Sequence, residues 1–444
     1  MKENKPNTPN VPADLPVARG AKALGIFLPA VILCVGFMIG LCWFLRPAVS
    51  ETEKRELTPF PSFTLDDVQS GAFTDGVSVW YADTFPGREA LIGAYQSIEA
   101  CFGIRSEQIQ IGGGGDDVPT GSMGDTPTSN RPDSGGEGGE TVGNYYISGN
   151  TAYELYAFND AGARRYAALL NQAAASLGDR ATVYDMVIPL HYSYALGADL
   201  QDELNLPNAG EVTSYLYSGM HDAVHTVDAH SALMAHRDEY LYFRTDHHWT
   251  ATGAYYAYEA FCRRAGITPT PLTSYERLAF EGFLGTLYAQ AERPAALRKE
   301  PDTVYAYVPQ GTNAMVTHTK SGDTVSTYSV VNRDTDTWYN AATKYNCFIA
   351  GDNPLIEIHN EHIASDRRGT SILLVKESFG NAFAPFLVDS YEYVYIIDYR
   401  YYDGTLANFV TEKDVDDVLF LNNIVATTAG VRLTEMERFV GSKQ

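Results

Sequence analysis

Residues 371–381 read SILLVKESFGN, an apolar run that passes directly into Lys-Glu-Ser-Phe-Gly-Asn. Ser371–Val375 is typical of a strand that is buried on both faces of a sheet. Ligand and catalytic groups of open α/β sheets collect beyond the carboxyl ends of such strands. Ser378 lies there, at the predicted junction of a strand with a helix, so this stretch predicts both the fold class and a site.

Other segments extend this pattern. Residues 251–264 (ATGAYYAYEAFCRR) have helical composition, with Thr250 available as the N-cap and Gly266 soon after the end. Buried strands that alternate with helices indicate an α/β fold with a mostly parallel sheet covered on both faces. Three further apolar runs complete the set of predicted strands: residues 183–190 (VYDMVIPL), 393–397 (YVYII) and 418–424 (VLFLNNI).

The longest uncharged stretch of the chain is residues 23–45 (ALGIFLPAVILCVGFMIGLCWFL). At ~1.5 Å rise per residue, a helix of this length spans ~34 Å, enough to cross a bilayer. Four basic residues precede the stretch, which favours a cytoplasmic N-terminus. We therefore predict a single-pass anchor with the remaining chain outside the cytoplasm.

Composition shifts divide the chain further. Residues 112–140 are rich in Gly, Ser, Thr, Pro and Asp and have little to bury. Alternating β-branched and Tyr residues between Thr303 and Cys347 predict an antiparallel β insertion. The predicted organisation is a cytoplasmic tail (1–22), a transmembrane anchor (23–45), a stalk with an N-terminal helical part (46–111), a disordered linker (112–140), and an α/β domain (141–444) with a β insertion at about 303–349.

Charge and cysteine content exclude several classes of protein. The 444 residues contain 32 Lys and Arg against 55 Asp and Glu, a formal charge of −23. Such a field repels phosphate backbones, so nucleic acid is not expected as a partner. Five cysteines without CxxC spacing give neither a disulfide scaffold nor a zinc motif, and the pairing of Cys101, Cys262 and Cys347 stays open.

A second polar segment, Thr245-Asp246-His247-His248-Trp249, lies directly before the predicted helix. A serine becomes a nucleophile when a neutral imidazole takes its proton, and a carboxylate fixes the tautomer of that imidazole. Asp246 and His248 are two residues apart, so in an extended loop they lie on one side and His247 points the other way. The predicted triad is therefore Ser378 as nucleophile, His248 as base and Asp246 as orienting carboxylate. Gly380 permits close backbone approach, and Asn381 offers an amide donor to an oxyanion.

The motifs RTDHHWTATGAYYAY, YADTFPGRE and LLVKESFGNAFAPFL resemble those of the DHHW proteins of bacterial envelopes, relatives of the alginate O-acetylation proteins. The resemblance implies an SGNH-hydrolase-like α/β/α sandwich and transfer of an acyl group, with acetyl preferred, to an envelope polysaccharide. It places the catalytic roles on Asp246, His248 and Ser378, and it implies a polytopic membrane O-acyltransferase as a partner and no cofactor. Glu377 departs from the pattern, since the relatives have Asp before the serine.

Arg400 resembles an arginine that such sites keep for orienting substrate, and Asn353 is an additional candidate oxyanion donor. Other interpretations stay open beside these. Arg400 could be a structural ion-pair partner. Trp249 could belong to the core or the site wall instead of binding sugar, as could the tyrosines of residues 255–258. Lys376 is interpreted as a surface or strand-end residue.

Two other functions compete with the enzyme. Asp246, His247 and His248 could be part of a metal site, although adjacent residues rarely aim at one ion and no metal is predicted. The chain could also be a non-catalytic envelope assembly or glycan-binding protein on a hydrolase-like scaffold. The preferred prediction is an extracytoplasmic acyl transferase or esterase, with the direction of reaction left open.

Overall fold

The structure is a computed structural model. It describes a few residues between Arg46 and Pro86, and residues 139–441 except 143, 292 and 319–324. The predicted tail, the anchor at 23–45 and all but the end of the predicted linker lie outside the described residues, as does Cys101. In the described part of the chain, no helix is both long and apolar enough to cross a bilayer.

The chain divides into two compact units, Met1–Ser97 and Ile98–Gln444. In the first unit, strand β1 (Val49–Ser50) pairs antiparallel with β2 (Arg55–Glu56). The Arg46 guanidinium lies 3.9 Å from the ring centroid of Trp80.

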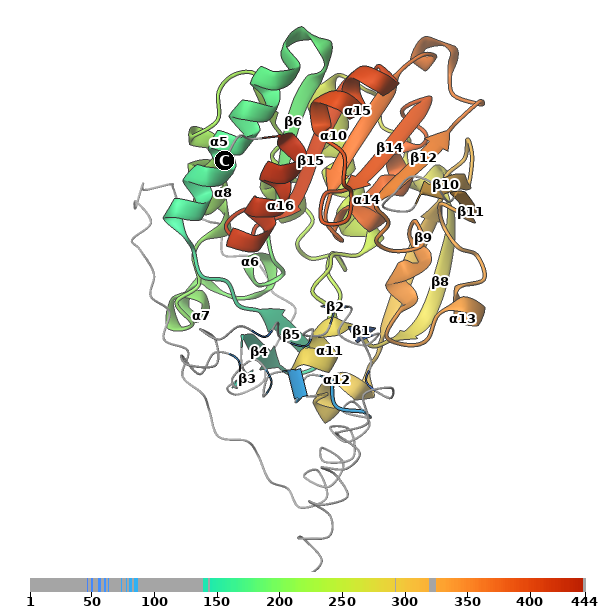
Figure 1. Cartoon of the computed structure of the whole chain (residues 1–444). Coiled ribbons are helices and arrows are strands. Elements are labelled where there is room, and N and C mark those ends of the chain that lie inside the picture. The colour runs from blue at the N-terminus through green and yellow to red at the C-terminus, as the bar shows by residue number, and fades with distance from the viewer. Residues whose placement is uncertain are drawn as a thin grey trace, which may run out of the picture. The chain divides into compact units, whose positions relative to one another are not determined.

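The second unit is a mixed α/β fold built on an eight-stranded sheet (Figure 1). Four of its seven strand pairings are parallel, and the three antiparallel ones lie together at one edge. The strand order is β11 (Val325–Ser329), β10 (Ala314–His318), β12 (Leu355–His359), β14 (Tyr393–Asp398), β13 (Ser371–Lys376), β15 (Asp417–Asn423), β6 (Thr182–Ile188) and β7 (Val224–Thr226). The predicted strands at 183–190, 371–375, 393–397 and 418–424 are thus confirmed as β6, β13, β14 and β15.

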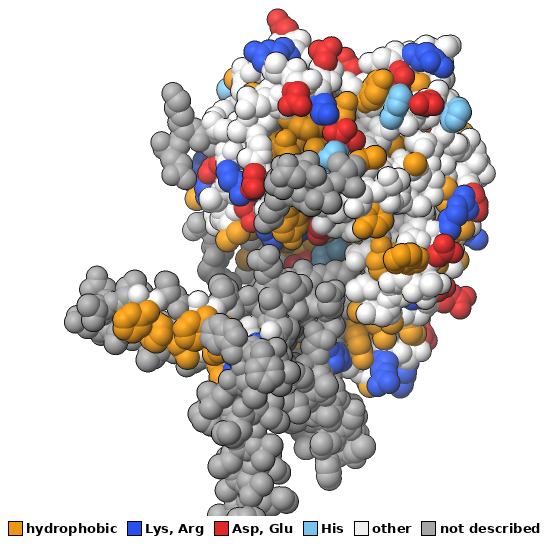
Figure 2. Space-filling model, turned by 45° about the vertical axis from the view of Figure 1, so that its right-hand side comes forward, with side chains coloured by type: hydrophobic (Ala, Val, Ile, Leu, Met, Phe, Trp, Pro, Cys, Tyr) orange, Lys and Arg blue, Asp and Glu red, His pale blue; other side chains and the backbone are white. Residues whose placement is uncertain are grey.

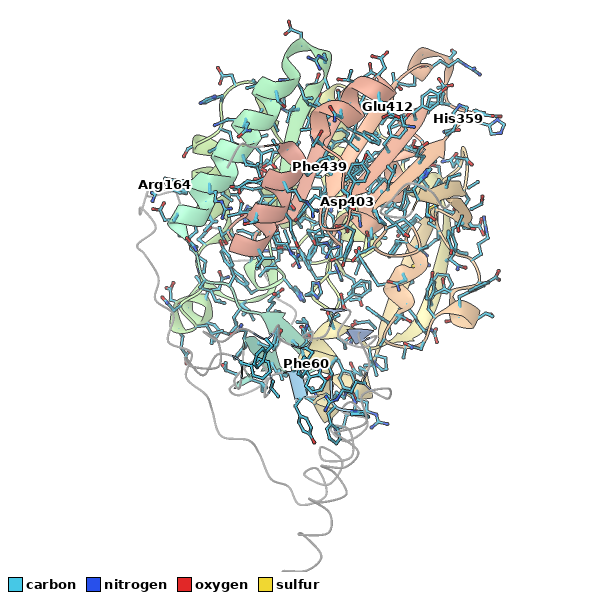
Figure 3. All side chains as sticks on the ribbon, in the orientation of Figure 1. Phe60, Arg164, His359, Asp403, Glu412 and Phe439 are labelled. Carbon is cyan, nitrogen blue, oxygen red and sulfur yellow. The ribbon has the colours of Figure 1, made fainter. Side chains whose placement is uncertain are left out.

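Helices cover both faces of this sheet (Figure 1). Successive side chains of β13 alternate between the two cores: Ile372 and Leu374 face one, and Leu373 and Val375 face the other. The first core also contains α9 (Ala229–Met234), α10 (Ala251–Ala265) and α14 (Gly380–Leu387); the second contains α5 (Asp160–Leu177), α8 (Ala209–Ser218), α15 (Leu406–Lys413) and α16 (Gly430–Val440). Arg164 lies on the outer side of α5, whereas Phe439 of α16 is fully buried (Figure 3).

Helix α10 begins and ends as its sequence predicts. The Thr250 side chain accepts a hydrogen bond from the Gly253 N–H, and Gly266 closes the helix at φ 70°. The shorter helices are α6 (Tyr192–Ala195), α7 (Ala198–Glu203), α11 (Thr286–Gln290), α12 (Ala295–Lys299), α13 (Thr335–Trp338), and the 3₁₀ turns η2 (Gly178–Arg180), η3 (Leu272–Ser274), η4 (Lys344–Cys347) and η5 (Ser365–Arg367).

The region predicted as an antiparallel β insertion contains antiparallel strands but no separate sheet of its own. Strand β9 (Asp302–Val308) pairs with β8 (Glu276–Phe283), whereas β10 and β11 extend the central sheet beyond β12. Their backbone groups complete the edge that β12 would otherwise leave open. A third small sheet contains β3 (Glu140–Val142), β4 (Tyr145–Ser148) and β5 (Thr151–Glu154).

Asp185 places a buried carboxyl group inside β6. The Tyr166 hydroxyl donates to its Oδ1 at 2.5 Å, and its Oδ2 has no partner among the described residues. Burial raises the pKa of Asp185 to about 7, although the hydrogen bond from Tyr166 opposes the shift. The folded state therefore favours the protonated acid.

This carboxyl predicts a pH dependence of stability. A folded pKa above the unfolded value stabilises the fold below about pH 4, and this stabilisation is lost as the pH rises through 7. The free energy of unfolding should therefore fall with pH in this window, with a contribution of up to about 1.4 kcal/mol per pH unit. Urea unfolding between pH 4 and 8 should show that Asp185→Asn removes this contribution. Parallel curves for the two proteins would contradict the prediction.

Candidate active site

Ser378 lies just beyond the carboxyl end of β13, in the turn that leads into α14. Its Oγ is 2.7 Å from His248 Nε2 and 3.2 Å from Glu377 Oε2. The Glu377 carboxylate is itself fixed by the backbone N–H groups of Phe379 and Asn423. Gly380 is required for packing, because a Cβ there would lie 2.5 Å from Lys376 Cβ. The turn therefore holds the serine hydroxyl in a single place against the imidazole.

The imidazole of His248 is oriented by Asp246. His248 Nδ1 lies 2.5 Å from Asp246 Oδ1, which also accepts the His248 backbone N–H at 3.0 Å. A carboxylate only accepts, so this contact assigns the proton of the neutral ring to Nδ1 and leaves Nε2 to accept from Ser378. The structure thus brings together the three residues that the sequence singles out.

Asp246 is buried and both of its oxygens are occupied. Oδ2 accepts the Thr286 N–H at 2.7 Å and the Thr286 hydroxyl at 2.9 Å. A Cβ at Gly285 would lie 2.3 Å from the carboxylate, so only glycine fits beside it. Burial alone would raise the pKa of Asp246, but His248, His247 and these hydrogen bonds bring it below its usual value. Asp246 is therefore held as an anion next to the base.

The loop itself is fixed from a distance by Asp302, which is fully buried at the start of β9. Its Oδ2 accepts the Thr245 N–H at 2.8 Å and the Thr245 hydroxyl at 2.6 Å. The Arg244 Nε donates to the other oxygen at 3.1 Å. A carboxylate 57 residues downstream thus shapes the segment that carries Asp246 and His248.

His247 does not point away from His248, as an extended loop would require. The two rings lie 3.9 Å apart, and His247 Nδ1 is 2.5 Å from the Thr286 hydroxyl. The segment is a succession of bends, so the alternation of a strand does not apply. Asp246, His247 and His248 each offer a ligand atom within 4.8 Å of the others, as a metal site would need. Hydrogen-bond donors from the protein already occupy both oxygens of the carboxylate.

Tyr345 completes the site, and the sequence analysis did not identify it. Its ring stacks on the His248 imidazole, with centroids 4.1 Å apart and planes at 12°. Its hydroxyl donates to the Ser378 carbonyl oxygen at 3.1 Å. Burial raises the pKa of this phenol well above its usual value, which keeps it a donor. The buried Tyr345 side chain therefore contacts both the His248 ring and the turn that carries Ser378.

This contact predicts a graded effect of two substitutions. Tyr345→Phe keeps the stacked ring and loses only the bond to Ser378, whereas Tyr345→Leu also loses the aromatic face that stabilises an imidazolium. Stacking of this kind contributes about 0.5–2 kcal/mol, so kcat for an ester substrate should fall about 2- to 30-fold in the leucine variant. The phenylalanine variant should fall less. Equal losses in both would show that the ring face has no role.

Sequence comparison adds to this geometry. The profile of the DHHW protein family matches residues 53–127 and 115–397. The chain belongs to the DHHW family. The four letters of the family name stand in this chain at Asp246–Trp249, the loop that holds the imidazole. No curated protein matches the chain.

Solved structures resemble this DHHW protein over most of their own length. A DHHW family protein from Eubacterium siraeum is 28% identical, with a TM-score of 0.61 over 69% of this chain and 98% of that one. PatB1 of Bacillus cereus, solved with a sulfonyl adduct, is 16% identical, with a TM-score of 0.54 over 66% and 97%. The O-acetyltransferase domain of Pseudomonas putida AlgJ is 14% identical, with a TM-score of only 0.34 over 65% and 96%.

The side chains expected to bind an oxyanion have other partners in the DHHW fold. Asn381 Nδ2 donates to Asp352 Oδ1 at 2.9 Å, and Asn353 Nδ2 donates to the Ile349 carbonyl at 3.2 Å. The Gly380 N–H donates to the Glu377 carbonyl at 2.9 Å. The backbone N–H of Ser378 has no hydrogen-bond partner in the described part of the chain. This N–H is therefore available to donate to a ligand beside the Ser378 side chain.

Lys376 and Arg400 share one cluster of charged side chains with Asp398 and Asp352. Lys376 is the last residue of β13, which confirms its interpretation as a strand-end residue, but it is fully buried and does not lie at the surface. Its Nζ lies 3.0 Å from Asp398 Oδ2 and 3.1 Å from Asp352 Oδ1. Arg400 makes two hydrogen bonds to Asp398, at 2.8 and 2.6 Å, and reaches Asp352 at 2.8 Å. The guanidinium is thus engaged by carboxylates beneath the DHHW site.

Trp249, the last residue of the DHHW motif, is a buried side chain that connects two loops of the site. It has no exposed surface, and its indole N–H donates to the Phe379 carbonyl at 2.9 Å. This bond ties the histidine loop to the serine turn and leaves no ring face for a sugar. Tyr255 and Tyr258 are buried in the core, in agreement with their interpretation as core or site wall. Cys262 and Cys347 are both fully buried.

Proposed function

We propose that this DHHW protein is a membrane-anchored, extracytoplasmic SGNH-like enzyme that moves an acyl group, with acetyl preferred, onto or off a hydroxyl of an envelope or exported polysaccharide. One observation carries the proposal. The carboxylate of Asp246, the imidazole of His248 and the hydroxyl of Ser378 form one line of hydrogen bonds, at 2.5 and 2.7 Å. This is the arrangement that makes a serine nucleophilic.

The reaction follows from the positions of these atoms. His248 Nε2 takes the proton of Ser378 while Oγ attacks the acyl carbon, and the Ser378 N–H donates to the oxyanion that forms. Collapse of this intermediate expels the donor's alcohol or thiol, which leaves with the proton from His248. An acceptor hydroxyl then gives its proton to His248 and attacks the acyl carbon. As the bond from that carbon to Ser378 Oγ breaks, His248 returns the proton to Oγ. Water in place of that hydroxyl makes the enzyme an esterase.

Asp246 and Tyr345 stabilise the charge that appears on the imidazole in each step. The carboxylate keeps its negative charge in the buried loop and contacts Nδ1–H. The Tyr345 face lies against the ring that becomes positive. Neither residue has to move during the reaction.

Location and partners rest on the sequence. We propose that residues 23–45 anchor the chain, because 23 residues without a charge suffice to span a bilayer. Residues 46–444 would then lie outside the cytoplasm, near the polymer. The acyl donor would be supplied by a polytopic membrane O-acyltransferase, as the resemblance to alginate O-acetylation proteins implies.

The test is direct observation of the acyl-enzyme. Full-length protein incubated with p-nitrophenyl acetate and quenched in acid should carry one acetyl group on the peptide that contains Ser378. Pretreatment with phenylmethylsulfonyl fluoride should block it. Absence of both modifications on Ser378 would overturn the proposal. An acetylated product formed after adding an oligosaccharide would distinguish transferase from esterase.

Glu377 favours a second candidate, a non-catalytic glycan-binding or assembly protein. A carboxylate 3.2 Å from Ser378 Oγ opposes negative charge on that oxygen. Under this alternative, the protein binds polymer and Ser378 never forms a covalent adduct.

A further inference from the structure

Trp338, at the end of α13, is unusually exposed for a tryptophan. Its exposed fraction is 72%, the highest of the large hydrophobic side chains among the described residues. Its indole makes no hydrogen bond and no aromatic contact within that part of the chain, although its backbone N–H is fixed to Asp334 O at 3.1 Å. Contiguous exposed apolar patches mark contact surfaces, so the surroundings of Trp338 decide whether it belongs to one.

The segment that carries Trp338 is attached to the active site at two points. Ala341 O accepts the Leu284 N–H at 3.0 Å, two residues before Thr286, which binds Asp246. Further along the same segment, Tyr345 stacks on His248. Ala341 is three positions after Trp338, so their Cα atoms are at most about 11 Å apart. The exposed indole therefore belongs to a segment that is bonded to residues of the candidate active site.

A second exposed ring precedes α13 in the chain. Tyr339 interacts electrostatically with Tyr328 of edge strand β11, and the Tyr328 side chain is 49% exposed. In the view of Figure 2, which brings the side with α13 forward, hydrophobic side chains lie among acidic and basic ones. We call Trp338 and Tyr328 the aromatic surface.

The charges near Trp338 limit the kind of polymer that could bind to the aromatic surface. The basic groups nearest in sequence to Trp338 are already paired: Arg333 with Glu276 at 2.5 and 2.7 Å, and Lys344 with Asp336. The chain as a whole carries −23. At Arg333 and Lys344 an anionic polymer would meet cations that are already paired, and the negative charge of the chain would repel it. A neutral or cationic pyranose chain has apolar ring faces that can stack on an indole while its hydroxyls stay in water.

We propose that the aromatic surface docks the acceptor polysaccharide, a neutral or cationic pyranose chain, outside the catalytic pocket. This inference rests on the proposed function but concerns binding and not chemistry. A small ester such as p-nitrophenyl acetate is too short to use the surface. Binding of the polysaccharide and release of nitrophenol can therefore be lost separately.

The experiment compares Trp338→Ala with Trp338→Phe and with a matched control, Val431→Ala, which removes an equally exposed apolar side chain from α16 (69%). Calorimetry with full-length protein uses cellohexaose, a chitosan hexamer and, as the anionic probe, a polygalacturonate hexamer. We expect binding of the neutral or cationic hexamer to weaken at least about tenfold in Trp338→Ala. It should be retained in Trp338→Phe and Val431→Ala, and the rate of nitrophenol release should be unchanged in all three.

Three results would overturn the inference: no binding of any hexamer to the wild type, equal binding by Trp338→Ala, or preference for the anionic hexamer. Self-association of the wild type that Trp338→Ala abolishes would instead assign the surface to a second copy of the chain. Failure of the wild type to release nitrophenol, with hexamer binding intact, would remove the proposed enzyme and leave the docking surface standing.

Discussion

Ser378→Ala should lower the rate of nitrophenol release from p-nitrophenyl acetate by at least about 10³-fold. The substitution removes the Oγ that would attack the acyl carbon in the proposed reaction, the atom that lies 2.7 Å from His248 Nε2. His248→Ala should cause a comparable loss, because an unassisted hydroxyl is a poor nucleophile. The double variant should be no slower than either single one, since residues that act as a unit are not additive.

Folding controls make this result specific. The Ser378 side chain makes hydrogen bonds only to His248 and Glu377 among the described residues, so its loss should leave the melting temperature nearly unchanged. Ser329→Ala removes an exposed hydroxyl from β11 and should leave the rate as it is. If Ser378→Ala and His248→Ala both release nitrophenol at the wild-type rate, the triad is not the catalytic group.

The parts of the fold that the sequence predicts are those set by local patterning. Continuous apolar runs indicated β6, β13, β14 and β15 because a strand covered on both faces has few polar positions. The ends of helix α10 were predictable because its N-cap Thr250 and its C-cap Gly266 are residue types typical of those positions. The strands β10 and β11 alternate, which indicated their antiparallel pairing, but alternation does not say which sheet a strand joins.

The site was predictable in its residue types and less so in its geometry. A serine after a buried strand and an Asp-x-His pair identify themselves by chemistry. The bends that bring His247 against His248 depend on Asp302 and Thr286, which are distant in sequence and hold the segment through several hydrogen bonds each. Tyr345 had no signal of its own, because a tyrosine in a region of alternating tyrosines is indistinguishable from its neighbours until the fold selects it.

The charged partners of Lys376 could not be predicted from the sequence either. A lysine after an apolar run has the pattern of a strand end that reaches water, and its partners come from elsewhere in the chain. Asp398 ends the neighbouring strand β14, and Asp352 precedes β12. Only the adjacency of β13 and β14 brings these charges together.

Lys376→Met should destabilise the fold by about 3–5 kcal/mol, the usual cost of removing one partner from a buried ion pair. Burial alone would lower the pKa of Lys376, but Asp398 and Asp352 raise it above its usual value, so the group lost is a cation. Two carboxylates would then share the single guanidinium of Arg400. Urea unfolding at pH 7 measures the loss.

A compensating variant separates lost charge balance from lost packing. Lys376→Met combined with Asp352→Asn removes one charge of each sign and keeps the paired hydrogen bonds from Arg400 to Asp398, at 2.8 and 2.6 Å. If uncompensated charge is the cause, the double variant should be more stable than Lys376→Met alone by at least about 1 kcal/mol. A double variant no more stable than the single one would place the cost in the packing of the lysine stem beneath Gly380. In that case the turn that carries Ser378 should shift, and nitrophenol release per folded molecule should fall together with stability.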